Sequence, residues 1–163
     1  MHRFTTSMRV AGLFAALALV AGATTASART HNQSRHETEP GLLLTYAKWF
    51  APGFPNMVGT VGGDIDGQFG GAVLRAMPDP TGRFIHLSAI YIVVAPDPSQ
   101  SLTMRVDGVQ DNQSGTAVLD GRVVDGYLWG AHVHAEYKVI SSCAQASGGV
   151  CFQGTIKVQR RTG

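Results

Sequence analysis

The sequence is poor in charge, in cysteine and in long apolar runs, and each shortage excludes a class of protein. Charged residues make up 15% of the chain, and 13 basic residues nearly balance 11 acidic ones. The apolar run from Val10 to Ala23 has 14 residues, fewer than the roughly 18 to 20 that a helix needs to cross a bilayer. A permanent membrane helix is therefore the weaker interpretation of this run.

The start of the chain is typical of a secretory signal peptide. Arg3 and Arg9 precede the apolar run, and the small-residue cleavage pattern Ala26-Ser27-Ala28 follows it. Removal of residues 1–28 takes away two basic residues and no acidic one, so the mature chain carries no formal net charge. A neutral chain has no general attraction for phosphates, which argues against a nucleic-acid partner. We predict a secreted protein, extracellular or periplasmic, with no membrane span after processing.

The rest of the chain divides into a tether and one domain. Residues 29–40 are polar throughout and lack the apolar side chains that would offset the entropy lost on ordering, so they are predicted to be disordered. Residues 41–163 are predicted to form a single domain, because the mature length suffices for one hydrophobic core.

No motif in the chain specifies a reaction. The glycine-rich segment VGTVGGDIDGQFGG is not followed by the Lys-Ser/Thr of a phosphate-binding loop. Ser88 and Ser114 lack the surroundings of a serine nucleophile. The sequence therefore identifies no catalytic residue and leaves open whether the protein is an enzyme, and no cofactor is predicted.

From Met57 onward, apolar and polar residues alternate with a period of two, which is typical of strands with one buried face. Turn-forming residues such as Pro78-Asp79-Pro80-Thr81-Gly82 separate the segments. The pattern predicts an all-β fold, an antiparallel up-and-down barrel of seven to eight strands, with a two-sheet sandwich as the alternative. Leu42–Phe50 is either an eighth strand or a short helix. The seven other strands are predicted at Val58–Asp66, Phe69–Ala76, Phe84–Val94, Leu102–Val109, Thr116–Val124, Trp129–Ile140 and Cys151–Gln159.

The two cysteines, Cys143 and Cys151, flank a short segment that contains Ser147-Gly148-Gly149. This segment can turn the chain and bring the two sulfur atoms to the facing ends of a hairpin. In an oxidising compartment such a pair forms a disulfide. We predict a disulfide that staples the C-terminal hairpin, because the spacing is not the CxxC of a redox or metal site.

One strand carries a polar face with the residue types of a metal site. His132, His134 and Glu136 alternate along the predicted strand Trp129–Ile140, and two histidines with one carboxylate can bind iron or zinc. These residues share the face predicted to be in solvent, and a straight row does not converge on one ion. Exposed polar side chains are therefore the favoured interpretation, and no metal is predicted.

The segment GTAVLDGRVVDGYLWGAHVHAEYKVI, with its GxVxxGxxxGAxVxxxY spacing, is followed after a loop by CFQGTIKV. Together with FIHLSAIYIVV and SLTMRVDGVQ, it resembles the barrel of the allene oxide cyclase and dirigent superfamily over about residues 57–159. The resemblance implies an eight-stranded antiparallel barrel, a largely apolar cavity that steers a hydrophobic reactant, dimers or trimers, and no cofactor. The chain carries no match to the acidic or tyrosine positions associated with catalysis or radical coupling in that superfamily.

Small residues at inward positions leave room for a cavity inside the predicted barrel. They are Ala117, Gly121, Ala131, Ala135 and Gly154. The leading hypothesis is a secreted barrel that binds, and in one version cyclises or orients, a small hydrophobic molecule without a metal. The alternative is an extracellular structural or interaction domain with a filled core. The side chains predicted to line the cavity are His86, Tyr91, Trp129, Tyr137 and Phe152.

Overall fold

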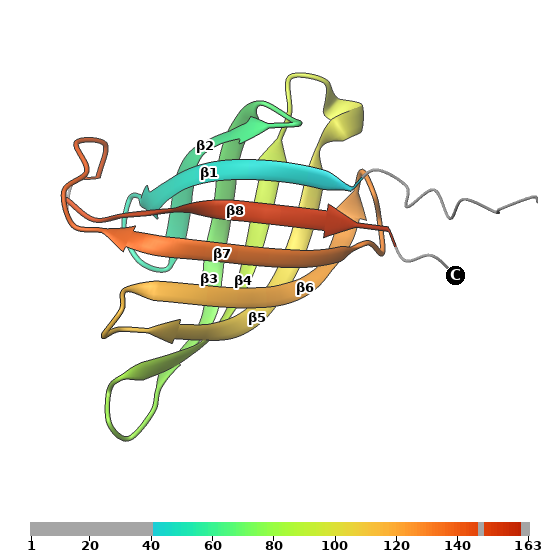
Figure 1. Ribbon diagram of the computed structural model, residues 1–163. Helices are drawn as coiled ribbons and strands as arrows, with labels where there is room; N and C mark the ends of the chain where they lie inside the picture. The colour runs from blue at the N-terminus through green and yellow to red at the C-terminus, as the bar shows by residue number, and fades with distance from the viewer. Residues whose placement is uncertain (1–40, 147–148, 161–163) are drawn as a thin grey trace, which may run out of the picture. The chain divides into compact units, whose positions relative to one another are not determined.

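The computed structural model describes residues 41–146 and 149–160, which fold into a closed antiparallel β-barrel (Figure 1). The predicted signal peptide, residues 1–28, and the predicted tether, residues 29–40, lie outside the described residues. No helix in the described part of the chain is long and apolar enough to cross a membrane.

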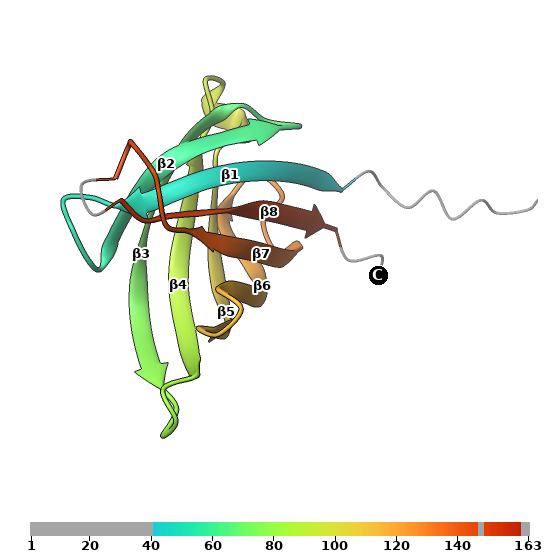
Figure 2. The same cartoon turned by 60° about the vertical axis from the view of Figure 1, so that its left-hand side comes forward.

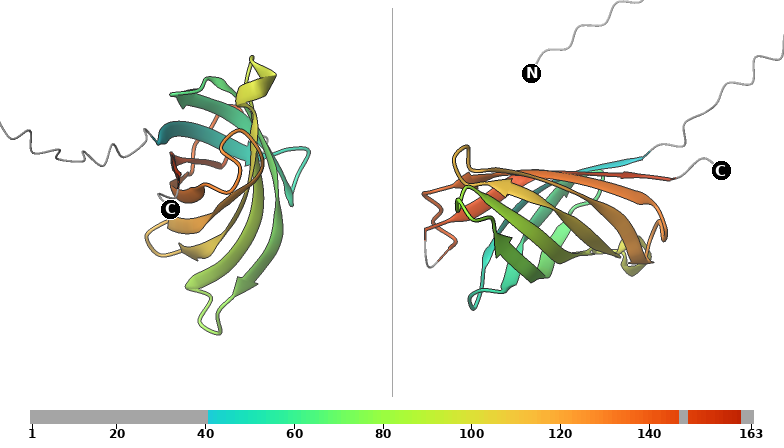
Figure 3. Two further views of the ribbon diagram at one scale, coloured as in Figure 1. Left: turned by 90° about the vertical axis from the view of Figure 1, so that its right-hand side faces the viewer. Right: turned by 90° about the horizontal axis from the view of Figure 1, so that it is seen from below.

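Each strand pairs with the next one in the chain, and the first pairs with the last, which closes the barrel. This confirms the all-β up-and-down barrel and excludes the sandwich alternative, and it shows that Leu42–Phe50 is a strand. Figure 3 shows the sheet curving round until the first and last strands lie side by side. The strands are β1 (Leu42–Phe50), β2 (Asn56–Gly63), β3 (Gly67–Pro78), β4 (Phe84–Val94), β5 (Leu102–Asp111), β6 (Thr116–Gly126), β7 (His132–Ile140) and β8 (Cys151–Gln159), with a short 3₁₀ helix η1 (Pro98–Gln100) between β4 and β5.

Alternation along each strand decides which side chains fill the barrel. In β4, Ala89, Tyr91 and Val93 are buried, while Ile92 and Val94 between and beyond them are exposed. At the end where the β4–β5 and β6–β7 connections lie, branched and other apolar side chains are buried in the interior. This closed end is built from Leu44, Val93, Leu102, Met104, Val123, Val133 and Val158.

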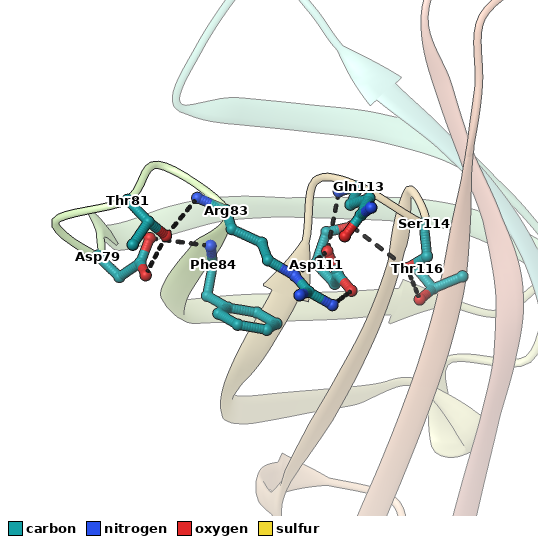
Figure 4. Close-up of polar contacts among 8 residues, drawn as sticks. All are labelled: Asp79, Thr81, Arg83, Phe84, Asp111, Gln113, Ser114 and Thr116. Atoms are coloured by element: carbon teal, nitrogen blue, oxygen red, sulfur yellow. Dashed lines mark hydrogen bonds and ion pairs between the residues drawn. The ribbon is translucent and has the colours of Figure 1, made fainter.

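At the opposite end, two of the hairpin turns are tied together. Figure 4 shows Arg83, in the β3–β4 turn, reaching Asp111 at the end of β5, with 3.2 Å between Nη2 and Oδ2. The Asp79 carboxylate accepts hydrogen bonds from the Thr81 hydroxyl at 2.6 Å and from the Phe84 amide at 3.0 Å. We call these two turns, residues 79–84 and 111–116, the rim. Figure 2 shows the β3–β4 hairpin projecting beyond the neighbouring strands, so the rim stands at one side of this end.

The predicted disulfide is confirmed. Cys143 and Cys151 are bonded, with 5.7 Å between their Cα atoms, and the bond joins the β7–β8 connection to the first residue of β8. A bond that closes so short a loop stabilises the folded state by about 2 to 3 kcal/mol in the chain-entropy treatment. The disulfide therefore fixes the last hairpin at the rim end of the barrel.

Glycines at inward positions of the sheet allow the backbones of neighbouring strands to approach closely. Gly154 in β8 pairs with Tyr46 in β1 on one side and with Tyr137 in β7 on the other. A Cβ atom at Gly154 would overlap the carbonyl oxygen of Glu136 in the neighbouring strand. Backbone oxygens in a closed sheet cannot move without distorting the ladder, so a side chain at this position strains the pairing of β7 with β8.

We expect Gly154→Ala to lower the free energy of unfolding by about 2 to 4 kcal/mol, because strain in the β7–β8 ladder replaces a close backbone contact. Gly70→Ala in β3 is the matched control, since a Cβ atom there meets only Ile92 Cβ at 3.9 Å. Urea denaturation of both variants gives the comparison. Equal effects of the two substitutions would show that the close approach at Gly154 does not govern the packing.

Candidate ligand cavity and its buried lysine

A cavity of about 230 Å³ enters the barrel at the rim end. Its volume exceeds the roughly 150 Å³ that accommodates benzene in an engineered protein cavity, and lies below the roughly 300 Å³ at which drug-sized sites begin. The size suits a molecule of on the order of ten non-hydrogen atoms. Most of its wall is apolar, made of Phe50, Phe54, Met57, Val73, Ala76, Ile85, Leu87, Ala89, Leu119 and Phe152, and its polar residues are Lys48, Tyr91, Gln110 and Tyr137.

Lys48 lies inside the barrel with 2% of its surface exposed. The strand phase puts it there, because Leu44, Tyr46 and Lys48 occupy alternate positions of β1 and all three are buried. No carboxylate forms an ion pair with Lys48 among the described residues, and its Nζ donates a hydrogen bond to the Tyr91 hydroxyl oxygen. The barrel therefore buries an amine whose polar partner is a phenol.

Aromatic rings surround the amine. The Lys48 Nζ atom lies 3.8 Å from the centre of the Tyr91 ring and 4.8 Å from that of Tyr137. The rings of Tyr46, Phe69 and Phe152 have their centres between 5.4 and 5.8 Å away. Tyr46 and Phe69 stack, and Phe69 meets Tyr91 edge to face, so the rings also fix one another. We call these five rings the aromatic cage.

Burial shifts the titrating groups of the cavity toward their neutral forms. It lowers the pKa of Lys48 well below its usual value of 10.5 and raises the pKa of Tyr91 above the usual 10, with the neighbouring phenols adding to the effect. It also raises the pKa values of Tyr46 and Tyr137. A desolvated cation–π contact returns roughly 2 kcal/mol to an ammonium group, whereas unpaired burial costs several kcal/mol. The aromatic cage therefore offsets the shift of Lys48 only in part.

Hydrogen bonds tie the cavity wall to the rim. The Tyr137 hydroxyl donates to Gln110 Oε1 at 2.7 Å, and Gln110 Nε2 donates to Asn112 Oδ1 at 2.7 Å. Asn112 in turn donates through Nδ2 to the carbonyl oxygen of Gly82 at 3.0 Å. This chain runs from β7 through β5 to the β3–β4 turn, so it holds one side of the cavity in a defined position.

Three of the five residues predicted to line a cavity do so: Tyr91, Tyr137 and Phe152. His86 does not, because the phase of β4 turns Ile85 and Leu87 inward and leaves His86 exposed on the outer face. Trp129 does not either. It lies in the β6–β7 turn, at the closed end, with 77% of its surface exposed, because β7 begins only at His132 and strand alternation does not extend through a turn.

The small inward residues do not line the cavity. Ala117, Ala131 and Ala135 are buried as predicted, but none of them lines the cavity. At Gly121 and Gly154 the space of the absent side chain is taken up by a carbonyl oxygen of the adjacent strand. The cavity instead lies toward the rim, where Val73 and Ala76 of β3 and Ile85 and Leu87 of β4 line it.

The histidine-rich face of β7 points outward, as predicted. His134 Nδ1 lies 2.7 Å from Asp120 Oδ1, and its Nε2 lies 3.0 Å from Glu136 Oε1, so both ring nitrogens have carboxylate partners. The two carboxylates raise the pKa of His134, chiefly through these hydrogen bonds. Neither His132, His134 and Glu136 nor any other group of three such side chains in the described ranges has an arrangement that could hold a metal ion.

The sequence analysis did not identify Lys48 as a site residue, although the alternation of residues in its strand indicates that it faces inward. In LLLTYAKWF a strand places Leu44, Tyr46, Lys48 and Phe50 on one face, so a lysine follows two large apolar residues into the interior. The prediction left this segment as a strand or a helix, and the phase was not applied to it. Gln110 was missed for a different reason, because the predicted strand ended at Val109 and the observed β5 continues to Asp111.

Comparisons with family models, with curated proteins and with solved structures find no match to this chain. The resemblance to the allene oxide cyclase and dirigent superfamily therefore stays a prediction from the sequence pattern.

We expect Lys48→Met to raise the free energy of unfolding by about 1 to 3 kcal/mol at pH 7, because an apolar side chain of similar length needs no compensation for lost hydration. This difference in the free energy of unfolding between Lys48→Met and the native protein depends on pH. An amine with a lowered pKa binds more protons in the unfolded chain, so the stability of the native sequence rises as pH increases toward 10.5. The gain from Lys48→Met should thus shrink between pH 7 and pH 9.

Urea denaturation at several pH values measures the difference in the free energy of unfolding between Lys48→Met and the native protein. Lys138→Met, on the outer face of β7, is the control. The control should change stability by less than about 0.5 kcal/mol at each pH. A Lys48→Met protein that is less stable than the native one at pH 7 would contradict the assignment of a costly buried amine.

Proposed function

We propose that this protein is a secreted binding protein for a small, mainly apolar molecule that carries one polar group. The observation that supports this most is the cavity itself, an apolar pocket with a small set of convergent polar side chains. The apolar part of the ligand occupies the space between Phe50, Ile85 and Leu87, and its polar group meets Lys48 and Tyr91. The alternative of a structural domain with a filled core predicts no such space.

Export is part of the proposal. The N-terminal sequence pattern motivates it, and the disulfide between Cys143 and Cys151 is compatible with an oxidising compartment. The ordered rim suits a binding role, because a fixed cavity loses little entropy when it takes up a ligand. Orienting or cyclising a bound reactant, and assembly into dimers or trimers, remain expectations from the superfamily resemblance.

Ligand binding can be tested with cuminyl alcohol, a neutral aromatic alcohol of 11 non-hydrogen atoms, about the number that the cavity volume allows. We expect it to raise the melting temperature of the native protein, by an amount that grows with the logarithm of the alcohol concentration once this exceeds Kd. Ala76→Trp, which places a large ring at the cavity wall, should weaken binding at least tenfold. Ala72→Trp on the same strand is the control, since Ala72 lies outside the cavity lining.

Binding that is equally strong in the native, Ala76→Trp and Ala72→Trp proteins would place the ligand elsewhere on the molecule. The absence of binding by the native protein, with a crystal structure in which side chains close the cavity, would overturn the proposal.

A further inference from the structure

Lys48 is placed where a purely structural residue would not be. Apart from the tyrosines, the buried polar or charged side chains of the described residues are Lys48 and Ser88, and of these two only Lys48 lines the cavity. A barrel of this kind packs at least as well with an apolar residue at such a position. A strongly perturbed group in a concave site is a candidate for chemistry.

We infer that the Lys48 amine captures the carbonyl group of small hydrophobic aldehydes as an imine inside the cavity. This inference rests on the proposed function, because it names the polar group of the ligand that the cavity binds. The cavity supplies the apolar contacts, and the amine at its polar end supplies the bond.

The position of the amine meets the chemical requirements of imine formation. The neutral form of a lysine is the nucleophile, and a desolvated lysine is neutral in larger proportion than a lysine in water. The low pKa that burial gives Lys48 therefore favours reaction at neutral pH. No acidic side chain pairs with Lys48 in the described residues to hold it as an ammonium ion.

The reaction balances without a cofactor or a further reactant. The Nζ lone pair attacks the carbonyl carbon, and a proton moves from nitrogen to oxygen to give a carbinolamine. The hydroxyl group then leaves with one more proton as water while the carbon–nitrogen double bond forms. The net change is an aldehyde and an amine giving an imine and one water molecule, with no oxidation or reduction.

Tyr91 is placed to move the protons. Its hydroxyl group is hydrogen-bonded to Lys48 Nζ, and burial keeps the phenol protonated by raising its pKa. A protonated phenol can donate to the departing hydroxyl group and recover the proton that nitrogen loses. The Tyr137 hydroxyl is already committed to Gln110, so it acts on the cavity wall rather than on the amine.

A carboxylate ligand fits the same position less well. It would need a charged Lys48, and it would bring a second charge into a largely apolar cavity, at a desolvation cost that one buried ion pair often fails to recover. An aldehyde is uncharged on entry, and its imine is uncharged as well. The aromatic cage also limits the access of water to the carbon–nitrogen double bond.

The test uses three ligands with one carbon skeleton: cuminaldehyde, cuminyl alcohol and cuminate. The purified protein is incubated with each in the presence of cyanoborohydride, and adducts are detected by intact mass and located by peptide mapping. We expect one adduct, from the aldehyde only, at Lys48. It should saturate at an aldehyde concentration at least tenfold lower than that needed to label the exposed Lys138 and Lys157.

Variants distinguish the reaction of the Lys48 amine from binding in the cavity. Lys48→Met and Lys48→Arg should lose the adduct. Lys48→Met should still bind p-cymene, the hydrocarbon with the same carbon skeleton, within about threefold of the native protein, because p-cymene has no polar group to meet Lys48. That result would show that the cavity is intact. Lys138→Arg and Lys157→Arg should leave the adduct unchanged. Tyr91→Phe should keep the adduct but slow its formation at least tenfold, with the largest effect where elimination of water limits the rate.

The outcomes distinguish the two proposals. Labelling spread over Lys138 and Lys157 with Lys48 unmodified, together with normal alcohol binding, would overturn the imine and leave the proposed binding function standing. Tighter binding of cuminate than of the alcohol, dependent on Lys48 and without an aldehyde adduct, would also overturn the imine, in favour of a carboxylate ligand. Failure of all three compounds to bind would count against the proposed function itself.

Discussion

Pairing between β1 and β8 is the constraint on which the rest of the structure depends. The ladder runs from Leu42 opposite Val158 to Lys48 opposite Phe152, and it joins the two ends of an otherwise open sheet. Once the sheet is closed, every second residue of each strand must face the interior. Lys48 cannot then reach solvent without breaking the phase of β1, so closure itself buries the amine.

The two ends of the barrel contribute differently to its stability. The closed end is packed with branched side chains, which supply the apolar burial that stabilises the barrel. The rim end holds the cavity, the aromatic cage and the amine, all of which contribute less to stability than a filled core would. Bonds at the periphery, the Arg83–Asp111 ion pair and the Cys143–Cys151 disulfide, hold this weaker end in place.

Much of the fold could be predicted from local pattern, because alternation and turn residues report directly on strand phase. The bounds of β4 and β8 and the disulfide were predicted correctly for that reason. The site was less accessible. Whether an inward glycine leaves a void or admits a neighbouring backbone depends on how strands coil around each other, as at Gly154, and no single-strand pattern contains that information. Trp129 was misplaced because the strand was predicted to start three residues too early.

The Lys48 amine lies buried beside the cavity with no counter-ion among the described residues, and burial shifts it toward its neutral form. The most direct measurement is a titration of the lysine side chains followed by NMR, with ¹³C at the ε carbons, in the folded protein and in urea. We expect the Lys48 signal to titrate well below 10.5 in the folded protein and to move to its usual value on unfolding. A midpoint at or above 10.5 in the folded protein would contradict this expectation.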